Sequence, residues 1–171
     1  MPDLALILLV EDKEDDILLV RRAFSKGGIL NPLHVVRDGD EAIEYLSGDG
    51  KYRNRAEYPL PQLMLLDLKM PGTDGFEVLQ WVRKQPLLGS LVVVVLTSSV
   101  AIRDINRAYR MGANSFLVKP MDFENTVEMA KTVQKYWLAM SQAPETSRED
   151  HRQGTETEQG GGKTEHEEGR L

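Results

Sequence analysis

The sequence has no cysteine and few aromatic residues. Its 171 residues include three His and two Trp, and aromatic side chains make up 6% of the chain. The absence of cysteine excludes disulfide bonds, thiolate metal sites and cysteine nucleophiles, and it is typical of proteins in a reducing compartment. His34, His151 and His166 lack the spacing of a metal-binding set, so we assign them no role.

Long apolar runs and a surplus of positive charge are also missing. The first apolar run, residues 4–10, ends at once in two acidic residues. We therefore expect no signal peptide and no membrane-spanning helix, and we place the protein in the cytoplasm. A net charge of −6 offers no basic surface for nucleic-acid phosphates, so we expect no direct DNA binding.

The composition divides the chain into two parts. Residues 1–140 carry 19 acidic and 17 basic side chains, whereas residues 141–171 carry 8 and 4 and have almost no apolar residues. The chain is long enough for one hydrophobic core but too short for two. We predict one folded domain over residues 1–140 and a disordered acidic tail over residues 141–171.

Short apolar segments alternate with amphipathic ones. The apolar segments predict buried parallel strands over residues 4–10, 33–36, 63–66, 91–96 and 115–118. The amphipathic segments predict helices over residues 15–25, 40–46, 74–84, 102–111 and 123–138. Five strand–helix units indicate an α/β domain, a doubly wound parallel sheet with helices on both faces.

Residues 47–61 form a long connection that is both charged and aromatic. It contains Lys51, Tyr52, Arg53, Arg55 and Tyr58. Two interpretations stay open. The favoured one is a solvated insertion, and the other is a functional loop.

Polar residues follow the predicted strands at their carboxyl ends. Glu11 and Asp12 follow the first strand, Asp67 the third, Thr97 the fourth and Lys119 the fifth. These ends share one edge of a parallel sheet, so we expect the side chains to converge. Three carboxylates repel one another unless a cation lies among them, and oxygen ligands favour Mg²⁺. Such a site lets an aspartate attack a phosphoryl group, with the lysine and threonine contacting the phosphoryl oxygens.

Each of these residues also has an ordinary structural explanation. Glu11, Asp12 and Asp67 fit as caps of the helices that follow them. Thr97 fits as a strand residue with a satisfied hydroxyl, and Lys119 as a surface cation beside a turn. Only the combination favours a functional site.

Four motifs at the predicted strand ends occur in a recognisable order. They are Leu-Leu-Val-Glu-Asp at 8–12, Leu-Asp-Leu-Lys-Met-Pro-Gly-Thr-Asp-Gly at 66–75, Leu-Thr-Ser at 96–98 and Lys-Pro at 119–120. Over residues 4–138 the chain resembles the receiver domain of two-component response regulators, the family of the chemotaxis switch protein. The resemblance implies a flavodoxin-like fold with strand order 2-1-3-4-5 and five helices.

The resemblance also implies a role for each matching residue. Asp67 is the expected phosphoacceptor, and Lys119 pairs with the phosphoryl group. Mg²⁺ is the expected cofactor. Its expected ligands are Asp12 and Asp67 directly, Glu11 through water, and the backbone carbonyl of Lys69.

The same resemblance implies a switch pair, Thr97 and Phe116, in which the threonine shifts toward the phosphate and the ring turns inward. Two residues depart from the commonest pattern, because Glu11 stands where many members have Asp and Phe116 where many have Tyr. The Phe116 ring has no hydroxyl, so its inward state depends on packing alone. Without the resemblance, Phe116 would be a core residue.

Two further expectations concern the surroundings of the reaction centre. The bond between Lys119 and Pro120 is usually cis in this family. Lys69 and Ser99 occupy positions at which family members tune hydrolysis of the phosphoryl group.

The function implied is that of a single-domain response regulator that accepts phosphate from a sensor histidine kinase and switches its binding to a downstream protein or relay partner. It catalyses only its own phosphorylation and dephosphorylation. The 47–61 loop is similar to that of regulators that partner bacterial phytochrome kinases. We also predict a homodimer, because apolar residues crowd the end of the last helix, namely Val133, Tyr136, Trp137, Leu138 and Met140.

Two other functions stay open at this stage. The first is a Mg²⁺-dependent phosphohydrolase with Asp67 as nucleophile. Against it, Lys69 stands where a second Asp would serve as acid or base, and no glycine-rich phosphate loop follows the first strand. The second is a receiver that has lost phosphorylation and serves as a scaffold, against which the complete set of reactive residues counts.

Overall fold

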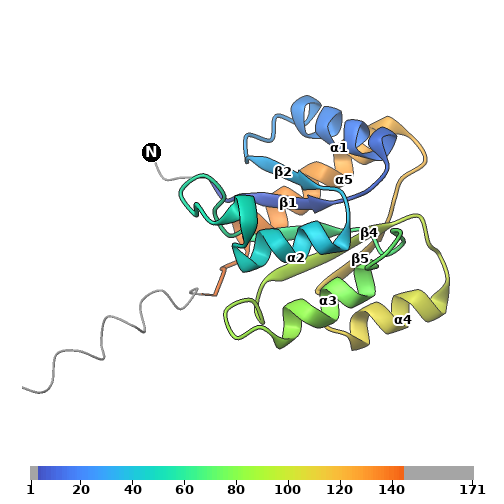
Figure 1. Cartoon of the computed structure of the whole chain (residues 1–171). Helices are drawn as coiled ribbons and strands as arrows, with labels where there is room; N and C mark the ends of the chain where they lie inside the picture. Colours follow the sequence, from blue (N-terminus) through green and yellow to red (C-terminus); the bar gives the residue numbers. More distant parts are fainter. Residues whose placement is uncertain (1–3, 145–171) are drawn as a thin grey trace, which may run out of the picture.

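A five-stranded parallel sheet runs through the centre of the molecule (Figure 1). The structure is a computed structural model that describes residues 4–144. The strands are β1 (Ile7–Val10), β2 (Leu33–Val36), β3 (Leu63–Leu66), β4 (Val92–Thr97) and β5 (Ser115–Val118). Their order is β2-β1-β3-β4-β5, and every neighbouring pair is parallel. The α/β class and the order 2-1-3-4-5 are therefore confirmed.

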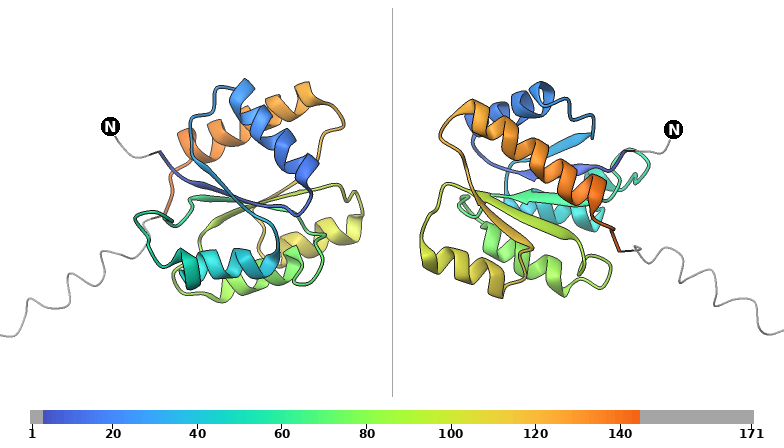
Figure 2. Two further views of the ribbon diagram at one scale, coloured as in Figure 1. Left: turned by 45° about the horizontal axis from the view of Figure 1, so that its top comes forward. Right: turned by 180° about the vertical axis from the view of Figure 1, so that it is seen from behind.

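Helices cover both faces of the sheet. One face carries α1 (Glu14–Lys26) and α5 (Phe123–Val133), and the other carries α2 (Gly39–Ser47), α3 (Gly75–Lys84) and α4 (Ile102–Arg110), as Figure 1 and the two views of Figure 2 show. A short 3₁₀ helix, η1 (Gly50–Tyr52), and a π-helix, η2 (Gln134–Met140), complete the described elements.

The core consists of two layers because successive strand side chains point to opposite faces. In β1, Leu8 and Val10 pack under α2 and α3, whereas Ile7 and Leu9 pack under α1 and α5. All four side chains are buried. This two-sided burial explains why the strands are continuous apolar runs rather than alternating ones.

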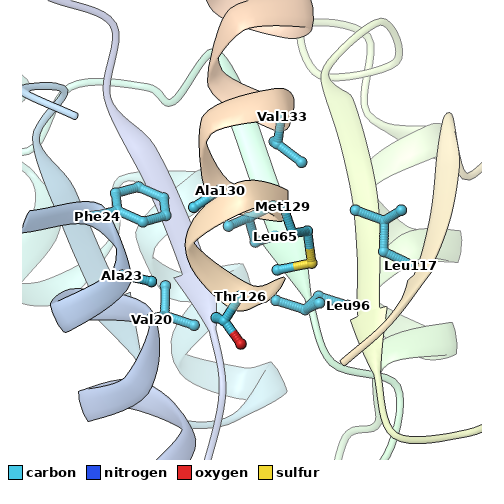
Figure 3. A pocket seen from close by; sticks show the side chains of 10 residues that line it. All are labelled: Val20, Ala23, Phe24, Leu65, Leu96, Leu117, Thr126, Met129, Ala130 and Val133. Carbon is cyan, nitrogen blue, oxygen red and sulfur yellow. The ribbon is translucent and has the colours of Figure 1, made fainter. Parts of the chain in front are cut away.

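A small cavity remains in the layer between α1, α5 and the sheet (Figure 3). Its lining is almost entirely apolar and comprises Val20, Ala23, Phe24, Leu65, Leu96, Leu117, Thr126, Met129, Ala130 and Val133. The one polar group, the Thr126 hydroxyl, donates a hydrogen bond to the Asp122 carbonyl at 2.9 Å. The cavity is therefore a packing gap in the core.

Aspartate caps fix the start of three helices. Asp38 accepts a hydrogen bond from the Glu41 N–H at the start of α2, and Asp122 accepts one from the Asn125 N–H at the start of α5. Asp74 and Glu77 form a capping box at the start of α3. Such caps satisfy N–H groups that have no partner within the helix, so they set where these helices begin.

Two element boundaries differ from the sequence expectations by more than one residue. The first strand begins at Ile7 rather than Leu4, because the register pairs Ile7 with Leu33 and Leu63, the first residues of β2 and β3. The last helix was expected to run from Phe123 to Leu138, but its regular α-helical part ends at Val133 and continues as η2. In a π-helix the backbone hydrogen bonds span five residues instead of four. The apolar periodicity of the sequence does not reveal this change.

Part of the connection over residues 47–61 is packed against the domain, so it is not a wholly solvated insertion. Tyr52 is only 1% exposed, and its ring contacts those of His34, Tyr45 and Tyr58, with centroid distances of 4.8–5.8 Å. Aromatic rings in such tilted and edge-to-face contacts bury a large apolar area. The segment therefore extends the core beyond α2 and β2.

Polar contacts fasten the same segment. The Arg55 guanidinium donates to the carbonyl oxygens of Tyr45 at 2.7 Å, Leu46 at 2.8 Å and Tyr58 at 3.1 Å. The Tyr52 hydroxyl donates to Glu41 Oε1 at 2.7 Å. These bonds join the first and last turns of α2 to the connection that follows it.

The residues behind the dimer prediction divide into two groups. Val133 is buried, and Trp137 and Leu138 pack against the core layer of α1 and α5, which accounts for them without a partner. Tyr136 and Met140 are exposed. The homodimer thus stays a prediction.

The predicted tail falls almost wholly outside the described residues, as do His151 and His166. The domain boundary near residue 140 likewise stays a prediction. Within residues 4–144, no helix has the length and apolarity needed to cross a membrane.

Candidate functional site

The carboxyl ends of the strands carry the candidate residues to one edge of the sheet. Hydrogen bonding continues just past the strands, because the Asp67 N–H donates to the Val10 carbonyl at 3.1 Å and the Lys119 N–H to the Thr97 carbonyl at 2.8 Å. The backbone therefore fixes where Asp67 and Lys119 lie before their side chains make any contact. The expected convergence is found.

Three carboxylates lie together at this edge. Glu11, Asp12 and Asp67 each place one carboxylate oxygen within 4.8 Å of the others. Glu11 is 2% exposed and Asp67 is 4% exposed. Carboxylates at this separation and burial repel one another strongly unless positive charge lies among them.

Lys119 supplies positive charge to the cluster. Its Nζ lies 2.6 Å from Glu11 Oε2, 2.8 Å from Asp16 Oδ2 and 3.2 Å from Asp67 Oδ2. The side chain is 14% exposed, so water screens these contacts only in part. The placement of Lys119 on the same side of the sheet as Asp67 agrees with the sequence analysis.

The pKa values reflect the crowding of negative charge. Burial raises the pKa of Glu11 to about 7, with a further rise from the charge of Asp67 and an opposing effect from the Lys119 hydrogen bond. Burial by itself would lower the pKa of Lys119, but its hydrogen bonds to Asp16 and Glu11 and the charge of Asp67 raise it above its ordinary value. The single positive charge of Lys119 does not offset the combined negative charge of the carboxylates around it.

The donor set fits a small divalent cation. Asp12 Oδ1 is buried and accepts no hydrogen bond from any described residue, whereas buried polar atoms normally have a partner. Unpaired carboxylate oxygens close to one another are the ligands that Mg²⁺ and similar hard cations prefer. The residues that would hold the ion are Glu11, Asp12 and Asp67.

The loop after β3 approaches the site closely. The Lys69 N–H donates to Asp67 Oδ1 at 3.3 Å, while its side chain is 68% exposed. Gly75, the first residue of α3, lies so near that a Cβ there would be 2.2 Å from the Asp67 carbonyl oxygen. Glycine at this position therefore lets α3 begin directly behind Asp67.

Thr97 and Ser99 line the site from the end of β4. Thr97 is buried, and its Oγ1 accepts a long hydrogen bond of 3.4 Å from the Ser99 N–H. The Ser99 hydroxyl donates to Asp104 Oδ2 at 2.6 Å. Thr97 therefore lies where the sequence analysis placed it, with its hydroxyl proton not engaged by these bonds.

Phe116 is partly buried against the core layer of α2, α3 and α4. Its N–H donates to the Tyr109 hydroxyl at 3.1 Å. This packing fits both interpretations of Phe116, as a core residue and as a ring that turns, so its role in switching stays a prediction.

One expectation about the site is wrong. No peptide bond among the described residues is cis, so the Lys119–Pro120 bond is trans. A prolyl bond prefers trans by only about 0.5–1 kcal/mol, and tertiary contacts therefore decide the isomer. Here the trans bond already lets Lys119 reach Glu11, Asp16 and Asp67.

Sequence reasoning missed two acidic residues at the site. Asp16 pairs with Lys119, and Asp104 lies 3.8 Å from Lys69 Nζ and accepts the Ser99 hydroxyl. Both lie in the first turn of a helix, where acidic residues are common because they stabilise the helix dipole. No sequence pattern separates Asp16 from its exposed neighbours Glu14 and Asp15.

Comparison with known proteins finds similar chains of one kind. Rcp1 of Synechocystis sp., described as a response regulator, is 36% identical over 132 residues, which cover 77% of this chain and 88% of Rcp1. A solved structure of the Mn²⁺-bound form of Rcp1 has a TM-score of 0.74 and 35% identity, and the match covers 82% of this chain and 99% of that one.

Two further solved structures are similar. The phosphorylated cyanobacterial phytochrome response regulator RcpA has a TM-score of 0.77 and 34% identity, with 83% of this chain and 99% of that chain covered. The bacteriophytochrome response regulator AtBRR has a TM-score of 0.67 and 42% identity, with 84% and 100% covered.

The family model of the response regulator receiver domain matches residues 7–131, which include every candidate residue at the sheet edge. Proteins of this family act in two-component signalling, and acceptance of phosphate on an aspartate beside a divalent metal is typical of them. This chain belongs to the response regulator receiver domain family.

Proposed function

We propose that the chain is a single-domain response regulator that accepts a phosphoryl group on Asp67 from a histidine kinase in a Mg²⁺-dependent reaction. The observation that carries the proposal is the position of Asp67. It is 4% exposed, shares a cluster with Glu11 and Asp12, and lies 3.2 Å from Lys119 Nζ. Glu11 shares these features, so the assignment of Asp67 also rests on its place in the motif at 66–75.

The proposed reaction moves one phosphoryl group. An Asp67 carboxylate oxygen forms a bond to phosphorus as the bond from phosphorus to the kinase histidine nitrogen breaks, and the histidine keeps the electron pair. Bound Mg²⁺ would offset negative charge on the carboxylate and the phosphoryl group. Lys119 then exchanges part of its contact with Asp67 for a phosphoryl oxygen, and the Thr97 hydroxyl donates to another.

The proposed ligand roles are those that the family resemblance implies. Asp12 and Asp67 would bind the ion directly, Glu11 would act through water, and the Lys69 carbonyl would complete the protein ligands. The unpartnered Asp12 Oδ1 supports this assignment. The Mn²⁺-bound form of the similar Rcp1 supports a divalent ion, and the all-oxygen donor set favours Mg²⁺.

A protein fits as phosphodonor because an apolar groove opens beside the acceptor. The groove lies between α1, the loop after β4 and the start of α5, and Lys119 and Asp16 are among the residues that line it. Val100 and Met121 on its rim are 71% and 101% exposed. The likeness to RcpA and AtBRR, named as phytochrome and bacteriophytochrome response regulators, supports a kinase of the phytochrome type. Because such a kinase draws its phosphate from ATP, the proposal implies a cytoplasmic protein.

Phosphorylation would then change partner binding. Thr97 and Phe116 lie at the end of β4 and in β5, between Asp67 and the surface formed by α4, β5 and α5. A shift of the Thr97 hydroxyl toward the phosphoryl group would leave room for the Phe116 ring to turn inward. The occupant of that surface is a downstream protein, a relay partner or a second copy of the chain.

Incubation with acetyl phosphate and Mg²⁺, followed by intact-mass measurement, tests the proposal. We expect the full chain to gain one phosphoryl group, and Asp67→Asn or excess EDTA to prevent the gain. Asp38→Asn, which alters a helix cap at the same edge of the sheet, is the control and should gain the group. Absence of any gain in the unaltered protein would contradict phosphorylation and leave the scaffold interpretation.

The kinetics of the same reaction test the phosphohydrolase alternative. A switch holds its phosphate, so while acetyl phosphate is present the chain should stay labelled with one phosphoryl group and release inorganic phosphate only slowly. Many rapid turnovers per chain would instead indicate an enzyme that acts on small substrates.

A further inference from the structure

Asp104 joins the two loops that border the phosphoacceptor. Its Oδ2 accepts the Ser99 hydroxyl at 2.6 Å and lies 3.8 Å from Lys69 Nζ. Ser99 belongs to the loop after β4, and Lys69 to the loop after β3, two residues beyond Asp67. The Asp104 carboxylate is 13% exposed, so it is shielded more than a surface acid.

Both partners of Asp104 connect directly to the reaction centre. The Ser99 N–H donates to Thr97 Oγ1 at 3.4 Å, and the Lys69 N–H donates to Asp67 Oδ1 at 3.3 Å. Ser99 has a single hydroxyl proton, and its short bond to Asp104 commits that proton. The Lys69 ammonium is drawn to the same carboxylate oxygen. Two donors beside Asp67 are therefore turned toward Asp104.

An ordinary structural role explains only part of this arrangement, in which Ser99 Oγ also accepts the Ala101 N–H at 3.3 Å at the start of α4. Asp104 lies in the first turn of α4, where an acid favours the helix dipole. However, the N-cap of α4 is Ala101, which makes no side-chain cap, and the hydrogen bond that Asp104 accepts comes from Ser99 rather than from a helix N–H. The carboxylate is directed toward the neighbouring loops.

We propose that Asp104 is a positioning residue that shortens the lifetime of phosphorylated Asp67 by holding the Ser99 hydroxyl and the Lys69 ammonium away from the phosphoryl oxygens. The inference rests on the proposed function, because it concerns loss of the same phosphoryl group. In hydrolysis, a water oxygen bonds to phosphorus and the bond from phosphorus to the Asp67 oxygen breaks. Phosphate keeps one water proton, and the other passes to solvent.

The proposal predicts the direction of the effect. Without the Asp104 charge, Ser99 and Lys69 are free to donate to the phosphoryl oxygens, where they stabilise the phosphorylated state and occupy the space that water must cross. Loss of such a competing contact should lengthen the lifetime by about threefold to tenfold.

The test is the decay rate of the phosphorylated full chain in Mg²⁺ after acetyl phosphate is removed, followed by intact mass. We expect Asp104→Asn to decay more slowly than the unaltered protein and Asp104→Glu, which keeps the charge, to decay at nearly the unaltered rate. A role in packing alone would give the opposite order, because Asn matches the shape of Asp. Asp38→Asn is the control and should decay at the unaltered rate.

A second comparison tests whether Asp104 acts through its two partners. In a Lys69→Ala/Ser99→Ala background, Asp104→Asn should leave the decay rate unchanged. An effect that persists there, or an Asp104→Asn lifetime equal to or shorter than the unaltered one, would overturn the inference. So would failure of both Asp104→Asn and Asp104→Ala to take up phosphate, because Asp104 would then be needed for phosphorylation itself.

The two proposals fail in different ways. If the unaltered protein takes up no phosphate, the proposed function falls and this inference falls with it. If all variants load and decay alike, only the role of Asp104 is refuted.

Discussion

Two glutamates, the buried Glu11 and the partly buried Glu41, show that the electrostatic environment differs between two regions of the domain. Glu11 at the sheet edge has a pKa raised to about 7 by burial and by the neighbouring Asp67. For Glu41 in α2, burial also acts to raise the pKa, but hydrogen bonds from Tyr52, the Arg37 N–H and Lys51 outweigh it and lower the pKa. The charged form of glutamate is thus disfavoured at the sheet edge and favoured in α2.

The difference separates a reactive region from a structural one. The sheet edge keeps an unpartnered Asp12 oxygen beside the carboxylates of Glu11 and Asp67, which favours the binding of a cation. The 47–61 segment instead pairs its polar groups with nearby acceptors. Functional sites commonly retain such strain at a cost in stability.

The largest predicted effect is at Lys119. Lys119→Met removes the cation that contacts Glu11, Asp16 and Asp67, so we expect the Mg²⁺-free protein at pH 8 to lose about 3–5 kcal/mol in the free energy of unfolding. Urea unfolding in EDTA measures this free energy. Lys135→Met, which removes an exposed lysine, should change it by less than about 0.5 kcal/mol. Equal losses in the two variants would refute the electrostatic account.

The next effect is at Arg55, in the structural region. Arg55→Ala removes three hydrogen bonds to the carbonyl oxygens of Tyr45, Leu46 and Tyr58, so we expect a loss of about 2–3 kcal/mol. The loss should be the same with and without Mg²⁺. Arg53→Ala, at an exposed position of the same segment, is the matched control. A Mg²⁺-dependent loss at Arg55 would break the separation between the two regions.

The pH dependence of stability sharpens the comparison of the glutamates. The folded state raises the pKa of Glu11 from 4.5 to about 7, so its contribution to stability is full below the lower value and is lost as pH rises through the higher one. In EDTA at pH 8, Glu11→Gln should therefore stabilise the protein by about 2 kcal/mol, after loss of its bond to Lys119.

Glu41 should show the reverse trend. Its folded pKa is lowered, so its contribution is present above the unfolded value and is lost as pH falls through the folded value. Glu41→Gln should therefore weaken the protein near neutral pH and flatten the acid side of its stability curve. Unfolding free energies measured in urea from about pH 4 to pH 8 check both variants. Parallel curves for the two would show that the regions do not differ.

The smallest effect is at Tyr52. Tyr52→Phe keeps the buried ring and removes the hydrogen bond to Glu41, so we expect a loss of about 1 kcal/mol. The variant should also raise the pKa of Glu41, which NMR titration of the carboxylate measures. An unchanged pKa would mean that the other two donors suffice.

Local sequence patterns predicted most of the fold. Apolar runs such as residues 63–66 predict buried strands, and polar residues directly after them identify the reactive edge. The order of motifs also indicated the partners of Asp67. Boundaries such as the start of β1 at Ile7 were missed, because they depend on where neighbouring strands begin.

Long-range contacts were harder to anticipate. Asp16 and Asp104 have the sequence signature of ordinary helix-start acids, and only the packing of α1 and α4 brings them to Lys119 and to Ser99. Likewise, the residues of the 47–61 segment suggest a solvated loop until Tyr52 is placed beside His34 and Tyr45.

The sequence by itself determined the alternating elements, the sheet edge that gathers Glu11, Asp12, Asp67, Thr97 and Lys119, and the chemistry that those groups favour. The tertiary structure decided the trans bond before Pro120, the packing of residues 47–61 and which acids reach the site. The physical reason is how far apart in the chain the interacting groups lie. Periodicity and strand ends are properties of neighbouring residues, whereas burial and charge pairing depend on groups far apart in the chain.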